Sequence, residues 1–286
     1  MDYTSRPQLD SPNMIAAFSG WNDAGQAAST AVRWLIDAWH AEQFAQVDPE
    51  EYYSFTDSRP TVRIVEGSQR ELSFPQSALY ATPADGAAPP SILMVAIEPN
   101  LKWRTYCNEI ITLARELGVR RIVTLGSLIT DAVHTRPVPL TGWATDDDVR
   151  AKLSARNITR SSYEGPTGIV GTLHSFCLEA DMPTASIWAA SPYYLGSTPN
   201  PKSALGLLDA LDDALGLRAD LSPLRTVAEE FERQVSMAVR DNEEVQDQIR
   251  RLEERYDAQE QPSPLPSPGS IIEDLEQFLR TQRDQD

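Results

Sequence analysis

A polar segment at residues 126–137 carries the side chains best suited to chemistry in this sequence. It contains Ser127, Asp131, His134 and Arg136, and it follows an apolar run typical of a buried strand. A serine, a histidine and an aspartate are the residue types that serve as nucleophile, base and orienting group in covalent catalysis. The same segment could instead be a structural loop whose histidine and arginine bond backbone carbonyls, because a sequence does not give the distances that catalysis requires.

A second polar loop, residues 20–25, also separates an apolar run from a helical pattern. Its glycines permit a tight turn, and Asp23 stands where a carboxylate either caps the following helix or orients a ligand. Trp21 could stack on a ring of such a ligand. The loop lacks both the GxGxxG spacing and the Gly-Lys-Ser/Thr ending of phosphate-binding loops, so it is not predicted to be one.

Two further loops could contribute to the same site. Residues 163–168 lead into a helix, whose free N–H groups either hold an anion or simply begin the helix. Tyr193 and Tyr194 follow another strand and either form the floor of a pocket or pack into the core. The candidate catalytic residues are therefore Asp23, Ser127 and His134, and the expected ligand site comprises Gly20, Trp21, Asn22, Asp23, Gly126, Ser127, His134, Arg136, Gly165, Thr167 and Tyr193.

Metal and cofactor motifs are missing from the sequence. Its three histidines are far apart, its two cysteines have no metal-type spacing, and neither an HExxH nor a GxSxG motif occurs. We expect no metal, no cofactor and two free thiols.

Strand and helix patterns alternate through the first 215 residues. Apolar runs at 14–18, 91–97, 121–125 and 185–188 predict buried strands, and helical spacing appears at 24–39, 103–117, 166–180 and 200–215. Strands that are apolar throughout indicate a mostly parallel sheet sandwiched by helices, an α/β fold. Residues 52–55 look extended, and residues 61–74 look like a β-hairpin insertion. Ligands of such sheets collect at the carboxyl ends of the strands, which is where the polar loops stand.

The C-terminal part, residues 221–286, differs from the α/β core expected at 1–220. We predict a long helix at 223–258, a Pro/Ser linker at 261–269 and a last helix at 270–282. The long helix carries a heptad seam with Asn242 as its one polar member. The seam could pack on its own domain, or it could form an intermolecular coiled coil or a partner-binding arm.

The chain is strongly acidic, with a net charge of −17 over 286 residues. From Asp212 to the end there are 19 acids and 9 bases, so this part holds −10 of that charge. Such a balance disfavours nucleic acid and anionic membrane surfaces as partners. No apolar run approaches the ~18 residues of a membrane span, and the polar N-terminus has no signal core, so we expect a cytoplasmic protein.

The loops taken together resemble the bacterial branch of the proteasome assembly chaperone 2 family, in its long form with a C-terminal helical extension. From about Met14 to Leu215 they occur in the family's order, as GWNDAG, GSLITDAVHTRP, YEGPTGIVG, SIWAASPYYL and NPKSALGLLDAL. The resemblance implies a core similar to the phosphorylase/nucleosidase-type fold and a hairpin, plausibly 61–74, that serves oligomerisation, with a homotrimer favoured. It also implies that the C-terminal helices act as a lid over a pocket lined by the loops named above.

The resemblance supplies no reaction, and a chaperone role is fold-level analogy. Our first hypothesis is a non-catalytic ligand- or protein-binding protein of the assembly-chaperone type, with a possible protein partner on its C-terminal helices. The alternative is a small-molecule hydrolase or transferase acting on a nucleoside-like or amide substrate, with Asp23 or His134 as acid or base and with Ser127 and Arg136 holding an anion. A purely structural oligomer is the third hypothesis, so the question of enzymatic activity stays open.

Overall fold

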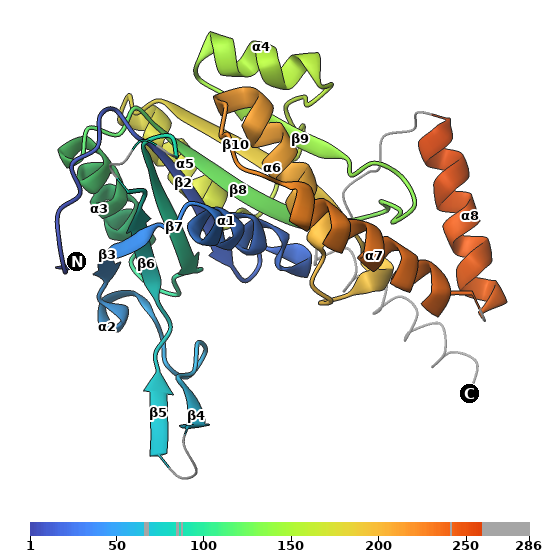
Figure 1. The fold of residues 1–286 in the computed structure, drawn as a ribbon, viewed down its shortest axis with the longest axis horizontal. Coiled ribbons are helices and arrows are strands. Elements are labelled where there is room, and N and C mark those ends of the chain that lie inside the picture. The colour runs from blue at the N-terminus through green and yellow to red at the C-terminus, as the bar shows by residue number, and fades with distance from the viewer. Residues whose placement is uncertain (66–68, 84–85, 87, 241, 259–286) are drawn as a thin grey trace, which may run out of the picture.

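A single eight-stranded sheet organises the molecule (Figure 1). The computed structural model describes residues 1–65, 69–83, 86, 88–240 and 242–258. In spatial order the strands are β1 (Asp2–Tyr3), β3 (Glu42–Val47), β6 (Ser77–Ala81), β7 (Ser91–Ile97), β2 (Asn13–Ser19), β8 (Arg121–Thr130), β10 (Thr184–Pro192) and β9 (Leu140–Ala144).

The four central strands, β7, β2, β8 and β10, are parallel to one another. Ile15 of β2 lies between Leu93 of β7 and Val123 of β8 in this register. Successive β2 residues enter opposite cores, which explains why the strand is apolar throughout. The α/β class with a mostly parallel central sheet is confirmed. The outer strands β1, β3, β6 and β9 pair antiparallel and were not predicted.

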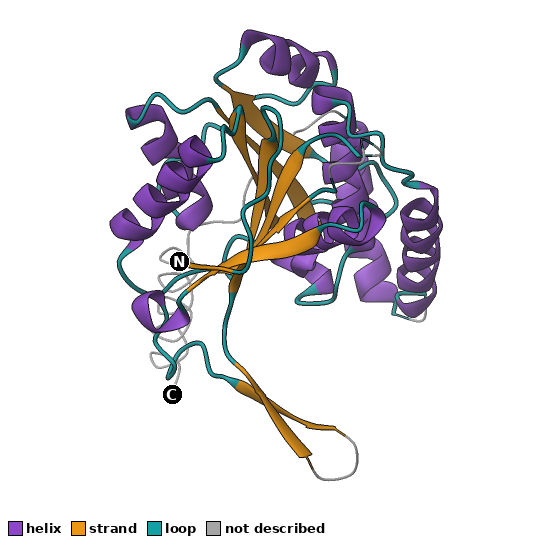
Figure 2. Cartoon of the chain, turned by 60° about the vertical axis from the view of Figure 1, so that its left-hand side comes forward, coloured by secondary structure: helices purple, strands orange, loops and turns teal. Residues whose placement is uncertain are grey.

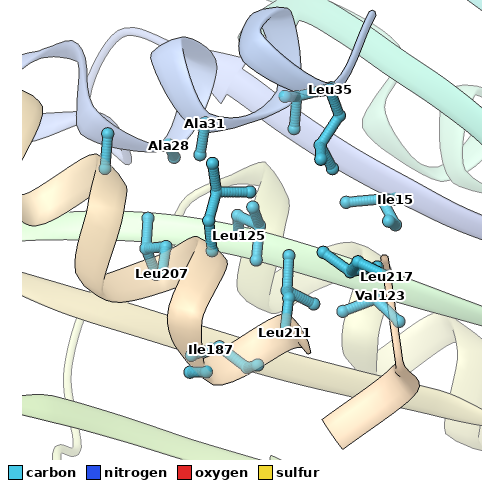
Figure 3. Close-up of a cluster of buried hydrophobic side chains, with 14 of the residues drawn as sticks. Ile15, Ala28, Ala31, Leu35, Val123, Leu125, Ile187, Leu207, Leu211 and Leu217 are labelled. Atoms are coloured by element: carbon cyan, nitrogen blue, oxygen red, sulfur yellow. The ribbon is translucent and has the colours of Figure 1, made fainter. Parts of the chain in front are cut away.

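Helices cover both faces of the sheet. One face packs against α1 (Ala27–Ala38) and α6 (Pro201–Leu215), with α4 (Asp147–Ala155) beside α6. Figure 3 shows this layer, in which Leu207 and Leu211 of α6 lie near Leu125 and Ile187 of the sheet. The other face packs against α3 (Trp103–Glu116) and α5 (Ile169–Glu179), which bury the free thiols Cys107 and Cys177. Among the helices that the structure describes, none is long and apolar enough to cross a membrane.

Residues 52–55, predicted to be extended, do not form a strand. Tyr52 is the last residue of a short helix, α2 (Pro49–Tyr52), and Phe55 lies in a turn. Asp48 caps this helix by accepting a hydrogen bond from the Glu50 amide, and Pro49 occupies the first helical position. Asp before Pro is a helix-start signal. The prediction missed it because the aromatic residues that follow are typical of a strand.

The predicted hairpin is present as β4 (Thr61–Val65) and β5 (Gln69–Ser73), and it extends away from the sheet in both views (Figures 1 and 2). Val62 lies opposite Leu72, and Ile64 lies opposite Arg70. Because side chains alternate along a strand, Val62, Ile64 and Leu72 share one face of the ribbon. The exposed fractions of these three side chains are 53, 71 and 57%. The hairpin thus exposes three apolar side chains on one face, beside Arg70.

The long helix predicted at 223–258 is wrong in one respect, because it is interrupted. Two helices, α7 (Ser222–Ala238) and α8 (Glu243–Asp257), meet at Asn242. Asn242 has an extended backbone and accepts a hydrogen bond from the Val245 amide, so it caps α8 instead of lying in a heptad seam. The linker and helix predicted at 261–282 lie outside the described residues.

The seam residues face the chain's own domain. Leu224 and Ala228 of α7 are buried in the core shared by α1 and α6. Ile249 and Leu252 of α8 pack with Val133. These four seam residues pack on the chain's own domain, whereas Ala238 is exposed and Phe231, Val235, Val245 and Tyr256 are half-buried.

Candidate functional site

The carboxyl ends of β2 and β7 lie side by side, next to Gly126 and Ser127, which are within strand β8 and not in a loop as predicted. After β2 ends, the Glu98 amide donates to the Ser19 carbonyl at 2.9 Å. On the other side the Ser127 amide donates to the Asn22 carbonyl at 2.8 Å. Residues 20–25 and 126–127 therefore form one continuous edge, as the parallel sheet predicts.

Asp23 caps α1 from this edge. Its Oδ1 accepts hydrogen bonds from the amides of Ala28 at 2.8 Å and Ser29 at 3.2 Å. The side chain reaches these amides because Gly25 and Gln26 both adopt the left-handed conformation, which tightens the turn before the helix. Burial raises the pKa of the Asp23 carboxyl above its usual 3.8, while the hydrogen bonds from Ser29 and Ala28 lower it. Its Oδ2 is buried without a hydrogen-bond partner in the described part of the chain.

Ser127 is fully buried, and its hydroxyl is already engaged. Its Oγ donates to the Ala24 carbonyl at 2.8 Å and lies 3.5 Å from Oδ1 of Asp23. The neighbouring Gly126 must lack a side chain, because a Cβ there would come within 2.4 Å of the Trp188 ring. These two residues hold the loop of Asp23 against the sheet.

Glu98, which sequence reasoning missed, joins this edge to α5. Its Oε1 accepts from Asn22 Nδ2 at 2.7 Å and from the amide of Ile169, the first residue of α5, at 2.8 Å. The amide of Asn22 leaves no room for a side chain at Gly168, where a Cβ would lie 2.2 Å from its Oδ1. The carboxylate of Glu98 therefore accepts a hydrogen bond from the first backbone amide of α5. The sequence signal that could have identified Glu98 is its position directly after a buried strand, β7.

Of the remaining predicted residues, Gly20 lies next to Glu98. Gly20 has a φ of +122°, and a Cβ there would stand 3.4 Å from the Cβ of Glu98. Trp21 is 55% exposed and stands free for contact with another molecule. Gly165 and Thr167 precede α5, which begins three residues later than predicted, at Ile169.

His134 lies in a second group of contacts, apart from Ser127. Its backbone amide and its Nδ1 both meet the Tyr194 hydroxyl, at 2.8 and 2.7 Å. Its Nε2 lies 3.1 Å from Ser236 Oγ on α7. Burial lowers the pKa of this imidazole below 6.5. Both ring nitrogens thus connect the loop after β8 to its neighbours.

The residues around His134 bind α8. Arg136 donates from Nε and Nη2 to the two carboxylate oxygens of Asp257 at 2.8 and 2.7 Å. Asp131 accepts from Arg255 at 2.8 Å, and Thr135 bonds Glu253. Tyr193 packs with Tyr194 and with the apolar cluster of Val133, Ile249 and Leu252.

The predicted site residues therefore fall into two groups. Asn22, Asp23 and Ser127 meet at the strand ends, whereas His134, Arg136 and Tyr193 meet under α7 and α8. Within the described ranges, no hydrogen bond joins Ser127, Asp131 and His134 to one another, so the arrangement of nucleophile, base and orienter is not formed. The described residues also contain no group of three or more His, Cys, Asp or Glu side chains able to hold a metal.

A cavity of about 10 Å³ lies beneath α7 and next to His134. This is close to the space of a single water molecule. Phe231 of α7 forms its roof, and Lys202, Asn200 and Ser203 from the start of α6 contribute its polar wall.

Comparison with known proteins identifies relatives over most of the chain. The sequence model of the PAC2 family matches residues 17–239. A crystal structure of a PAC2 family protein from Streptomyces avermitilis is 42% identical, with 83% of this chain and 99% of that chain covered and a TM-score of 0.73. The Mycobacterium tuberculosis proteasome-assembly chaperone homologue Rv2125 is 37% identical, with 82 and 99% covered and a TM-score of 0.74.

A more distant likeness extends to archaea. The Pyrococcus furiosus archaeal proteasome activator PbaB is 22% identical, with 83% of this chain and 97% of that chain covered and a TM-score of 0.63. At this identity the likeness concerns the fold alone. No curated protein matches the chain.

Proposed function

This chain belongs to the PAC2 family, and from that premise we propose that it is a cytoplasmic, assembly-chaperone-like protein that binds protein partners and catalyses no reaction. The proteasome-assembly chaperone homologue at 37% identity supports the kind of partner, which we take to be proteasome subunits.

The observation that carries this proposal is the apolar face of the hairpin. Val62, Ile64 and Leu72 are exposed on one side of a two-stranded ribbon that extends from the body. The opposite side is polar, with Arg63 facing Glu71. A two-stranded hairpin is marginally stable alone, and exposed apolar side chains on one face are typical of an interface. We propose that this face joins copies of the chain into a homotrimer.

The engagement of the candidate catalytic groups supports binding over catalysis. The hydroxyl of Ser127 is bonded to a backbone carbonyl, and both ring nitrogens of His134 are bonded to Tyr194 and Ser236. A nucleophile and its base need to reach one another and a substrate. In this chain the same side chains hold loops and helices in place.

The pocket and its cover are the finer part of the proposal. We propose that residues 221–286 form an extension that covers a binding pocket of the core, residues 1–220. The contacts of His134, Thr135 and Arg136 with α7 and α8 support a cover that closes on the loop after β8.

Binding of purified proteasome α and β subunits from the host organism tests the function. We expect the full chain to capture unassembled subunits and to raise the yield of assembled particles, measured by native gel and mass photometry. The test variant is Ile64→Asp, which should weaken both the capture of subunits and the yield of assembled particles if the trimer is the active form. Subunits that neither bind the chain nor assemble faster in its presence would refute the proposal.

A further inference from the structure

Lys202 is the cation nearest the cavity under α7. It lies in the first turn of α6, and its side chain is 19% exposed. Its ammonium donates to the His134 carbonyl and pairs with Glu232 of α7. Asn200 caps the same helix by accepting from the Ser203 amide. The ammonium of Lys202, in the first turn of a 15-residue helix, is therefore paired with one carboxylate.

The wall opposite this charge is apolar. Phe231, next to Glu232 in sequence, covers the cavity and is half-buried. The surface beneath it is formed by Val133, Val138, Pro139, Ala190 and Pro192. A cavity that remains under an aromatic ring shows that Phe231 does not fill this surface completely. The cavity itself is only water-sized, so a ligand needs the space that Phe231 and Glu232 occupy. Without those two side chains, the site would combine an apolar wall with a cation at its end.

The part of α7 that occupies this site is held weakly. The buried residues of α7, Leu224 and Ala228, both belong to its first half. From Glu229 to Ala238 every residue is exposed or half-buried. Among the described residues, its polar contacts with other elements are Glu232 with Lys202 and Ser236 with His134. Ion pairs with partly exposed partners contribute little to stability, so a ligand could displace this half of the helix.

We propose that the Lys202 pocket, formed by Lys202 and the walls of this cavity, binds an organic carboxylate that carries an apolar group. In the closed form Glu232 takes the place of the ligand's carboxylate, and Phe231 takes the place of its apolar group. This inference rests on the proposed function, since it names the ligand class of the pocket that α7 covers.

Calorimetric titration with 3-phenylpropionate tests the site, with the neutral 3-phenylpropionamide as the matched probe. We expect the full-length Phe231→Ala/Glu232→Ala variant to bind the carboxylate at least ~10-fold more tightly than the wild type, because α7 no longer competes for the pocket. Adding Lys202→Met should reverse this gain, and the amide should bind at least ~10-fold more weakly than the carboxylate. Equal binding of acid and amide, binding that is insensitive to Lys202→Met, or no binding would each overturn the proposal.

Two further measurements keep the result decisive. Glu232→Gln retains Phe231 and should give the same ranking of acid over amide if the double variant folds poorly. In the wild type, saturating 3-phenylpropionate should speed hydrogen exchange in residues 229–238 and leave α1 unchanged. Unchanged exchange in 229–238 at saturation would contradict the displacement of α7. Because these tests use the protein alone, they can fail while proteasome subunits still bind, and the reverse also holds.

Discussion

Arg136 and Asp257 form a two-pronged ion pair, with N–O distances of 2.8 and 2.7 Å across 121 residues of chain. The pair joins the loop that follows a central strand to the last turn of α8. A planar guanidinium that meets a carboxylate with two parallel hydrogen bonds fixes direction as well as distance. The position of α8 over the loop depends on this geometry, and the first prediction follows from it.

Removing the guanidinium with Arg136→Ala should loosen α8. We expect amide hydrogen exchange in residues 243–257 to increase by about two- to fivefold, the range typical of an exposed pair. The matched control is Arg233→Ala, because Arg233 pairs with Glu230 inside α7 and bonds no other element among the described residues. Equal exchange in the two variants would show that the ion pair does not position α8.

Acid should weaken the docking of α7 through His134. Burial lowers the folded-state pKa of this imidazole below 6.5, so the unfolded chain takes up the proton more readily. Stability that is fully present above pH 6.5 is therefore lost as the pH falls toward the lower folded value. Hydrogen exchange in residues 229–238 should rise between pH 7 and pH 5.5, after correction for the intrinsic exchange rate.

The control for this pH effect is a second, half-buried histidine. Burial also lowers the pKa of His174, which lies under β9 against Trp143 and away from α7. His134→Gln should abolish the pH dependence in 229–238, whereas His174→Gln should leave it intact. A pH response in α7 that survives His134→Gln would assign it to another group.

Asp23 should behave as a helix cap. Asp23→Ala removes the acceptor of the Ala28 and Ser29 amides and should lower the free energy of unfolding by about 1–2 kcal/mol. Asp23→Asn keeps an acceptor oxygen and removes a buried charge, so its loss should be clearly smaller. Chemical denaturation at pH 7 measures both variants. Full stability of Asp23→Ala would instead point to a ligand-binding carboxylate.

Ile64→Asp should dissociate the proposed trimer, because it replaces the most exposed of the three apolar side chains on this face of the hairpin with a carboxylate. Gln69→Asp is the matched control, since residue 69 pairs with Val65 on the opposite face of the same ribbon. Light scattering after size-exclusion chromatography gives the mass of each variant. A wild-type chain of monomer mass, or a trimer that tolerates Ile64→Asp, would refute the role of this face.

Strands buried on both sides could be located from their apolar runs, and edge strands could not. The predicted strands at 121–125 and 185–188 are too short, because β8 continues to Thr130 and β10 to Pro192. β7 was expected at 91–97 and occupies those residues, because an apolar run of that length has few alternatives. β3 and β9 mix polar residues with apolar ones and gain their strand structure from pairing with a neighbour. The break at Asn242 was missed for a related reason. An asparagine suits both a polar seam position and a helix cap, and tertiary packing decides between them.

The candidate site was predicted as a region and not as a set of contacts. The rule that ligands gather at the carboxyl ends of parallel strands pointed to residues 20–25 and 126–137, but residues 126–130 belong to strand β8 and only residues 131–137 follow it. It could not foresee that Arg136 is bound by Asp257 or that His134 meets Ser236, because nothing local in the sequence encodes a partner more than 100 residues away. Glu98 was overlooked because a single acid after a strand has no motif around it.

The manner in which the two C-terminal helices are attached has a kinetic consequence. Leu224 and Ala228 anchor the start of α7 in the core, and α8 is anchored on the loop by Ile249, Leu252 and the Arg136 pair. Between these anchors, residues 229–238 are exposed or half-buried and are therefore held less firmly than the two ends. This part of α7 can move away from the core in a unimolecular step while both anchors stay in place. The observed rate of ligand binding to the Lys202 pocket should then level off at high ligand concentration, at the rate constant of this opening step.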